Sequence, residues 1–266
     1  MRADMHIHST VSDGSYSLKD IVKKAEDKGL DGVAITDHDT LSHGRQLPYS
    51  AKVKVMAGIE ISAFDYNKNY RVHILGFNIK NPVLVEEAVR PTLEARNTNS
   101  LKQIEILNQH GFDIDIEKVP KADGKYIYKQ HIMDYLYSIG KVDELFGDFY
   151  YKTFKNNGIC HFDITYLDPI KAIRTIKDAG GTAVLAHCGQ QQNFELIPEF
   201  VENGLDGLEL NHHANSKADR EIIRKYAKKY GLLLTGGSDC HGRYEPSSPE
   251  IGDYLAESDS AEILFS

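Results

Sequence analysis

Histidine and carboxylate side chains recur along the sequence in an arrangement that suits divalent metal ions. His6 and His8 are two residues apart, and so are Asp239 and His241. Residues two apart in an extended strand point to the same face, so each pair can serve one site. The remaining candidates stand singly: Asp13, His38, Glu60, His73 and His187. Imidazole and carboxylate ligands suit zinc, manganese and iron, and the absence of cysteine among them argues against a purely structural zinc site.

Such a ligand set favours chemistry at phosphorus. A bridging carboxylate can hold two cations about 3.5–4 Å apart, the spacing used for in-line displacement of a phosphate ester. Three divalent cations would outweigh the carboxylates of Asp13, Glu60 and Asp239 by about three positive charges. That surplus would attract a phosphate dianion in a chain whose net charge is −8.

The candidate ligands fall within or just after segments with the pattern of buried strands. We predict these strands, separated mainly by helical patterns, at residues 3–8, 32–36, 53–61, 71–77, 182–186, 207–210 and 232–235. Such alternation predicts a parallel sheet of the α/β class, closed or open. The carboxyl ends of parallel strands gather on one rim, where we expect the candidate ligands to converge.

Residues 82–165 show a different pattern, with helices predicted at 83–108 and 130–139 and little that is typical of a strand. We interpret this stretch as a helical insert covering the active site, and residues 1–81 and 166–266 as the domain that carries it. Among the other histidines, His43, His110 and His161 are assigned to the surface or to packing. His212 and His213 follow a strand and can reach the rim.

Composition limits the alternatives. The chain has 266 residues, enough for one sizeable domain with an insert, and its net charge of −8 argues against a surface for duplex nucleic acid. Three cysteines are too few for a disulfide framework. Residues 1–4 lack the apolar region of a secretory signal, and no run reaches the roughly 20 apolar residues of a membrane span. We therefore expect a cytoplasmic protein that does not enter membranes.

Seven motifs resemble those of the PHP family, named for polymerase and histidinol phosphatase domains. They occur in the family's order and span nearly the whole chain outside the insert: Asp4-Met-His-Ile-His8, Ser12-Asp-Gly14, Thr36-Asp-His-Asp39, Gly58-Ile-Glu-Ile-Ser62, Val72-His-Ile-Leu-Gly76, Ala186-His187 and Gly237-Ser-Asp-Cys-His241. The resemblance implies an α/β fold, a distorted (β/α)7 barrel with two or three divalent metal ions (Mn, Zn or Fe) at its carboxyl rim.

The resemblance also implies a role for each ligand. One metal would be held by His6, His8, Glu60 and Asp239. A second would share Glu60 and add His73 and His187, and a third would use Asp13, His38 and His241. Asp37 would orient neighbouring ligands. A hydroxide bridging two metals would attack phosphorus. The group that protonates the leaving oxygen stays open among His212, His213, His131 and a metal-bound water.

Within the family, the chain resembles short bacterial members with a helical insert, which include phosphatases of nucleoside 3′,5′-bisphosphates and enzymes that trim RNA from its 5′ end. Where such members often have Arg-Pro-His, this chain has Lys129-Gln130-His131. We predict substrate contacts from Lys129, His131 and Arg243. The expected reaction is hydrolysis of a phosphomonoester, foremost of a nucleotide (a 3′,5′-bisphosphate or a monophosphate). Three alternatives remain: a histidinol-phosphate phosphatase, a 5′-3′ exonuclease on short RNA, and a non-catalytic regulatory module.

Overall fold

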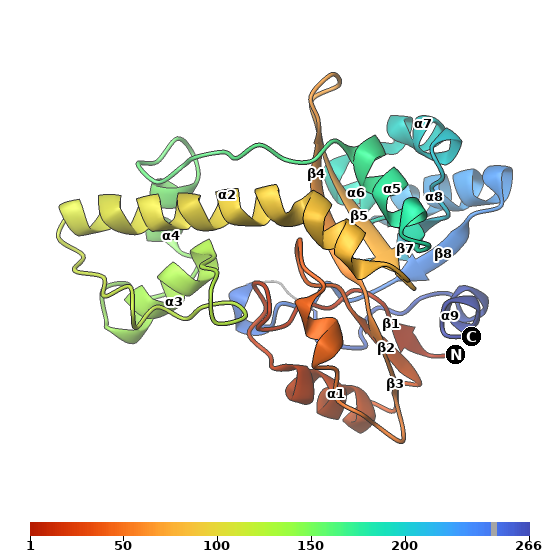
Figure 1. The fold of residues 1–266 in the computed structure, drawn as a ribbon, viewed down its shortest axis with the longest axis horizontal. Coiled ribbons are helices and arrows are strands. Elements are labelled where there is room, and N and C mark those ends of the chain that lie inside the picture. The colour runs from red at the N-terminus through yellow and green to blue at the C-terminus, as the bar shows by residue number, and fades with distance from the viewer. Residues whose placement is uncertain (246–248) are drawn as a thin grey trace.

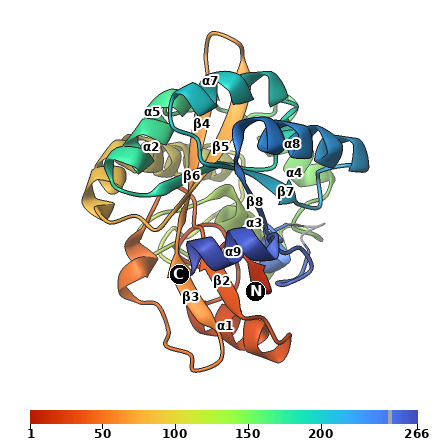
Figure 2. The ribbon, with the colours of Figure 1, turned by 90° about the vertical axis from the view of Figure 1, so that its right-hand side faces the viewer.

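The structure, a computed structural model, describes residues 1–245 and 249–266, and their strands form two sheets. The first sheet, in the order β1-β2-β3, consists of Ala3–Asp4, Gly32–Ile35 and Lys54–Ala57. The second, in the order β4-β5-β6-β7-β8, consists of Ile59–Asp65, Tyr70–Phe77, Thr182–Leu185, Gly207–Asn211 and Leu233–Gly236. Helices pack around both sheets, and the two chain ends lie side by side (Figures 1 and 2).

The second sheet is mixed, so the prediction of a parallel sheet holds for the first sheet and for β6–β8 but is wrong for β5. Strand β5 is antiparallel to both β4 and β6, whereas β6, β7 and β8 run parallel. The antiparallel pairing of β4 with β5 follows from the short turn after β4, where Asp65 accepts hydrogen bonds from the backbone of Asn67 and Lys68. A turn this tight can join only antiparallel strands, because a parallel connection needs a crossover of a dozen or more residues.

The predicted strand at residues 53–61 is two strands, β3 and β4, which belong to different sheets. Gly58 lies at the break, where its amide donates to the carbonyl of Ile35. A Cβ at position 58 would lie 2.9 Å from Thr36 and 3.0 Å from the carbonyl oxygen of Gly76. Glycine therefore permits the close approach that lets the chain pass from one sheet to the other.

The two sheets meet along two edges. Isolated parallel bridges join Ile7 to Cys240 and His38 to Glu60. Over the described ranges 1–245 and 249–266, however, the strands do not form one continuous closed sheet. Both junctions lie beside candidate metal ligands, so the contacts that hold the sheets together also position the site.

Polar N-caps begin several of the surrounding helices. Ser17 and Asp20 form a capping box at α1, Ser216 and Asp219 form one at α8, and Asp168 caps α5. The helices outside the segment 82–165 are α1 (Leu18–Asp27), α5 (Pro169–Asp178), α6 (Cys188–Gln191), α7 (Ile197–Glu202), α8 (Lys217–Tyr230) and α9 (Ser258–Leu264). Helices α6 and α9 were not predicted from the sequence.

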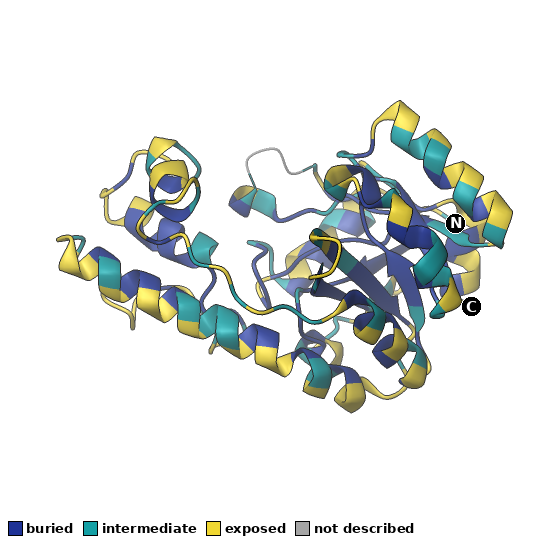
Figure 3. Ribbon diagram, turned by 90° about the horizontal axis from the view of Figure 1, so that it is seen from above, coloured by how far each residue is buried: buried dark blue, intermediate teal, exposed yellow. Residues whose placement is uncertain are grey.

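Residues 82–165, hereafter the helical segment, contain α2 (Pro82–Gln109), α3 (Lys129–Ser138) and α4 (Asp148–Phe154). Their apolar side chains form a cluster of their own, which includes Leu107, Leu136 and Phe154. The first turns of α2 instead bury Val85 and Val89 in the core beneath the second sheet. Figures 1 and 3 show α2 running from the sheets to the far end of the segment, with its buried residues facing inward.

Pro91 lies inside α2, where its missing N–H removes one helical hydrogen bond. Figure 1 shows that the helix bends along its length, as helices commonly do at proline. No helix of the described residues has the length and apolar character needed to cross a membrane.

Candidate metal centre

Glu60 in β4 lies at the centre of the predicted ligand set, with histidines at both of its carboxylate oxygens. Oε1 is 2.7 Å from Nδ1 of His73 and 3.0 Å from Nε2 of His187. Oε2 is 3.3, 3.1 and 3.2 Å from ring nitrogens of His6, His8 and His38, respectively. The carboxylate therefore faces two different sets of imidazoles, which is the geometry that a bridging ligand requires.

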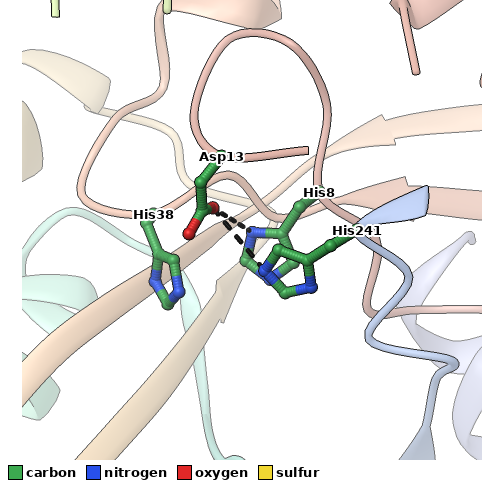
Figure 4. A group of neighbouring side chains, drawn as sticks. All are labelled: His8, Asp13, His38 and His241. Atoms are coloured by element: carbon green, nitrogen blue, oxygen red, sulfur yellow. Dashed lines mark ion pairs between the residues drawn. The ribbon is translucent and has the colours of Figure 1, made fainter. Parts of the chain in front are cut away.

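The remaining carboxylates complete two further clusters. Oδ1 of Asp239 is 3.3 Å from Nε2 of His6 and 3.1 Å from Nε2 of His8. Oδ1 of Asp13 is 3.6 Å from ring nitrogens of both His8 and His241. The rings of His8 and His241 stack with centroids 4.0 Å apart beneath this carboxylate, and His38 lies on its other side (Figure 4).

Three groups of predicted ligands each have donor atoms within 4.8 Å of one another. They are His6, His8, Glu60 and Asp239; His8, Asp13, His38 and His241; and His38, Glu60 and His73. The first group coincides with the set expected for one ion, and the second contains the set expected for another. His187 joins the third through its contact with Glu60. The structure thus brings together every ligand that the sequence predicted.

The hydrogen-bonding state of these side chains fits a bound metal. Both ring nitrogens of His8 and Nε2 of His6 are buried and lie 3.1–3.6 Å from carboxylate oxygens, but none of the three has a partner in hydrogen-bond geometry among the described residues. Oδ1 of Asp13 is likewise buried and has no partner in hydrogen-bond geometry among these residues. Buried polar atoms normally have a partner, and leaving one unsatisfied costs about 1–3 kcal/mol. Nitrogen and oxygen atoms that converge in this way are suited to coordinate divalent cations.

The electrostatics hold the carboxylates ionised. Burial would raise the pKa of Glu60, but the surrounding histidines, led by His38, hold it well below its ordinary value. The pKa values of Asp13 and Asp239 are lowered in the same way against burial. Burial would conversely lower the pKa of His8, yet contacts with Asp239 and Glu60 raise it to about 10. A metal ion must therefore displace a proton from His8 to bind it.

The backbone carries the ligands in uncommon conformations. His187 and Asp239, which follow β6 and β8, have φ angles of +22° and +51°. Non-glycine residues adopt such angles infrequently, and clusters of them are typical of functional sites. At Gly237 a Cβ would lie 2.3 Å from the backbone nitrogen of His6, so only glycine lets the two ligand-bearing segments come this close.

Asp37 stands outside the ligand groups, where it holds the loop that carries Asp13. Its carboxylate accepts hydrogen bonds from the backbone and hydroxyl of Ser9 (2.8 and 2.7 Å) and from the hydroxyl of Ser12 (2.6 Å). His43 lies 3.1 Å away and is fully buried, which agrees with its assignment to packing. His110 and His161 are exposed.

Glu209, which was not predicted as part of the site, is fully buried in β7. Its Oε1 lies 3.0 Å from Nδ1 of His6, and its Oε2 accepts a 2.8 Å hydrogen bond from the backbone of His187. A carboxylate on the far nitrogen of a ligating histidine fixes the orientation of the ring and raises its basicity. An acid between Leu208 and Leu210 in an apolar strand was the signal that could have revealed it.

The two histidines after β7 differ in their placement. Nε2 of His212 is 3.3 Å from Oδ2 of Asp239, and His212 forms a further buried group with His6 and Glu209. His213 stands next to it and packs toward the ring of Tyr254. His212 therefore contacts a predicted ligand directly, whereas His213 contacts the ring of His212.

A cavity of about 260 Å³ opens beside the clustered ligands. Asp13, His38 and His73 line one part of it, and the helical segment supplies much of the rest. Four basic side chains also line it: Arg71, Arg96, Lys129 and Lys155. Burial, followed by the charges of Lys155, Arg96 and Arg71, lowers the pKa of Lys129 to about 8. Cations that repel one another in a confined space are suited to bind an anion.

The predicted substrate contacts are placed unequally. Lys129 lines the cavity. His131 is buried, and its Nδ1 accepts a 3.2 Å hydrogen bond from the backbone amide of Tyr128. Arg243 pairs with Asp134 at 2.7 Å. Neither His131 nor Arg243 is among the described residues that line the cavity.

Three other basic residues of this cavity were not predicted. Arg71 lies two residues before His73 in β5, a spacing that could have revealed it. Arg96 of α2 binds Oδ2 of Asp39 at 2.9 Å and the hydroxyl of Ser62 at 3.0 Å. Lys155 follows α4 directly. Arg96 and Lys155 reach the cavity only through packing of the helical segment.

Comparison with known proteins agrees with this geometry. The sequence matches the PHP domain family over residues 4–245. It is 38% identical over 250 residues to the phosphoribosyl 1,2-cyclic phosphate 1,2-diphosphodiesterase of Eggerthella lenta, a match that covers 92% of this chain and 95% of the relative. It is 30% identical to a 5′-3′ exoribonuclease of Haemophilus influenzae, over 90% of this chain and 89% of that protein.

A solved structure also resembles this chain over nearly its whole length. A protein of Bifidobacterium adolescentis assigned as a metal-dependent phosphoesterase superposes with a TM-score of 0.83 at 29% sequence identity, covering 98% of this chain and 94% of that one. Homology over nearly the whole length therefore accompanies the clustered histidines and carboxylates. The chain belongs to the PHP domain family and is a metal-dependent phosphoesterase.

Proposed function

We propose that this protein hydrolyses a phosphoester of a small substrate that carries a second phosphate group. The observation that supports this best is the cavity in which Asp13, His38 and His73 share one space with Arg71, Arg96, Lys129 and Lys155. One phosphate group would lie against the ions held by the clustered ligands, and the other against the basic side chains. Arg96 and Arg71 already lie near the carboxylates of Asp39 and Asp163, so the second phosphate would chiefly add an anionic partner for Lys129 and Lys155.

We assign the ligands as the family resemblance implies, and the clusters support this assignment. His6, His8, Glu60 and Asp239 would hold one ion, Glu60, His73 and His187 a second, and Asp13, His38 and His241 a third. The imidazole and carboxylate donors suit manganese, zinc or iron. When bound, the ions supply Lewis-acid chemistry by activating water and stabilising charge on the phosphoryl oxygens. The chain's own residues hold the site in shape: Glu209 orients His6, and Asp37 fixes the loop that carries Asp13.

Backbone bonds also support a distorted barrel as the frame of this site. The bridge between Ile7 and Cys240 joins one edge of the two sheets, and the bridge between His38 and Glu60 joins the other. We propose that the sheets are parts of one irregular (β/α) barrel with the ligands at its rim. The helical segment would cover that rim.

The first substrate to test is a ribosyl 1,2-cyclic phosphate with a 5-phosphate. The Eggerthella lenta relative, whose name specifies such a phosphoribosyl cyclic phosphate, aligns over nearly its whole length. Water would attack phosphorus, one ester P–O bond would break, and the freed sugar oxygen would take a proton. The 5-phosphate would remain on the basic side chains throughout.

A nucleoside 3′,5′-bisphosphate is the second candidate, because Tyr150, Phe162 and Tyr166 line the same cavity and offer rings on which a base can stack. Several nucleotides of an RNA strand fit less well, since about 260 Å³ is slightly below the roughly 300–1,000 Å³ typical of a site for one small ligand. These aromatic residues therefore favour a single nucleotide over an oligonucleotide.

A product screen on the manganese-loaded protein tests the proposal. ³¹P NMR should compare the ribosyl cyclic phosphate, adenosine 3′,5′-bisphosphate, AMP, histidinol phosphate and a short 5′-phosphorylated RNA. We expect kcat/KM to be highest for a substrate with two phosphate groups. Elemental analysis should find at least two divalent ions per chain, and chelation should abolish hydrolysis. A protein that holds its ions but hydrolyses none of these esters would refute the proposal.

A further inference from the structure

Helix α3 reaches the candidate metal centre through one side chain, Gln130. Its Nε2 donates a hydrogen bond of 3.1 Å to Oδ2 of Asp13. An ionised carboxylate can only accept hydrogen bonds, so the amide must present its nitrogen to this contact. Asp13 is only 5% exposed, which leaves this oxygen little access to solvent. The bond therefore links the helical segment directly to a proposed metal ligand.

The two oxygens of Asp13 face different partners. Oδ1 is 3.6 Å from ring nitrogens of His8 and of His241, whereas Oδ2 faces Gln130. Figure 4 shows the carboxylate lying between these rings and His38. A donor on Oδ2 fixes the rotation of the carboxylate and thereby aims Oδ1 at the histidines. Partners of this kind behind a ligand typically change metal affinity by about 10–100-fold when they are removed.

Other contacts of the helical segment reach the same part of the site. The hydroxyl of Tyr128 donates to the backbone carbonyl of His38 at 3.3 Å. Arg96 binds Asp39, the residue after His38, at 2.9 Å. The segments that carry Asp13 and His38 are thus both bonded to the helical segment. Of these contacts, the hydrogen bond from Gln130 is made to an oxygen of a proposed ligand.

We infer that Gln130 is a positioning residue that sets the metal affinity of the group formed by Asp13, His38 and His241. This inference rests on the three-ion arrangement proposed above. It makes the helical segment part of the metal centre as well as part of the substrate cavity. Ligand orientation at the third ion then depends on how α3 is seated.

Three variants of the full-length protein test this role. Gln130→Met keeps an unbranched side chain of similar length but removes the donor. Gln130→Glu keeps the shape and places a second carboxylate against Asp13. Gln103→Met is the matched control, because this buried glutamine lines the same cavity but donates to the carbonyl of Cys160 at 2.8 Å. Each apoprotein should be titrated with manganese, and bound ions should be counted by elemental analysis after dialysis.

We expect the weakest-bound ion of Gln130→Met to dissociate about 10–100-fold more readily than in the wild type, with the other ions retained. Gln130→Glu also lacks a donor once ionised, but its added negative charge attracts cations, so its titration curve should depart from both the wild type and Gln130→Met, whereas a role in packing alone predicts a wild-type curve for Gln130→Glu, because glutamate is the closer shape match. Gln103→Met should keep the wild-type metal count. Wild-type titration curves for both Gln130 variants would overturn the inference while leaving the proposed function intact. A wild-type protein that binds only two ions would overturn both the three-ion arrangement and the inference.

Discussion

Glu209 lies behind His6, with its Oε1 3.0 Å from Nδ1 of that ring, while Nε2 of the same ring faces Glu60 and Asp239. The imidazole is therefore held between a supporting carboxylate on one side and proposed co-ligands on the other. Burial would raise the pKa of Glu209, but His6 and His212 hold it below its ordinary value. An ionised Glu209 keeps the proton of His6 on Nδ1 and leaves Nε2 for a metal.

Replacing Glu209 should weaken metal binding without unfolding the protein. Glu209→Gln keeps the size of the side chain but removes its charge, so we expect metal affinity to fall about 10–100-fold. Metal titration of the apoprotein measures this change. The surface variant Glu221→Gln on α8 removes the same charge away from the site and should bind metal as the wild type does. Unchanged affinity in Glu209→Gln would remove Glu209 from the metal centre.

Replacing Glu60 should have a larger effect, because its two oxygens face separate sets of histidines. Glu60→Gln should lose bound metal and reduce turnover by more than about 100-fold, beyond the usual effect of a residue behind a ligand. Circular dichroism should show that the fold persists. Turnover near the wild-type value, with an unchanged metal count, would exclude Glu60 as a ligand.

Metal affinity should rise with pH across the neutral range. The pKa of His8 is raised to about 10, since its contacts with Asp239 and Glu60 outweigh burial. Below that pH the ring is protonated in the apoprotein, so binding must release a proton. Each released proton strengthens binding about tenfold per pH unit. Manganese titrations at pH 6, 7 and 8 should show this slope, and a flat profile would contradict it.

Lys129 should discriminate between substrates. Lys129→Ala removes a charge-assisted contact worth about 1.5–3 kcal/mol, or about tenfold or more in affinity. KM should therefore rise strongly for a substrate with two phosphate groups and little for p-nitrophenyl phosphate, which has no second phosphate. The exposed Lys125, which lies near the start of α3, gives the control variant Lys125→Ala. Equal effects on both substrates would show that Lys129 does not contact the second phosphate.

The same lysine predicts a pH dependence of substrate binding. Burial and the neighbouring cations lower the pKa of Lys129 to about 8, so its positive charge is complete well below that pH and is lost above it. KM for the substrate with two phosphates should accordingly rise as the pH passes about 8, and this rise should be absent in Lys129→Ala. A rise of equal size in the variant would assign the titration to another group.

The clustering of the proposed metal ligands was predictable from sequence because each belongs to a short local pattern near the end of a strand or within one. His6 and His8 share one strand face, and Asp239 and His241 repeat that spacing. Glu209 and Gln130 were not predicted as parts of the site, because their roles depend on partners more than 100 residues away in the chain. No local spacing encodes such a pairing.

The positions of the fold's elements were also predictable from the sequence, whereas some of their pairings were not. Most strand and helix positions follow from periodicity, but the pairing of β5 with β6 depends on tertiary packing. The division at Gly58 was also hidden, because residues 53–61 read as one apolar run and only the close approach of Gly76 and Thr36 requires the break. The basic side chains of the cavity come from both β5 and the helical segment, so their meeting depends on how the two are packed together.

Helix α2 belongs to two apolar cores, since Val85 and Val89 pack beneath the second sheet and Leu107 packs within the helical segment. A chimera that exchanges substrate preference between relatives should therefore join the parents inside this helix, after Val89, and not at Asn81, immediately before the helix begins. A junction at Asn81 would import foreign side chains into the recipient's core. A junction after Val89 would move the donor's cavity wall, including the position of Arg96, as one unit.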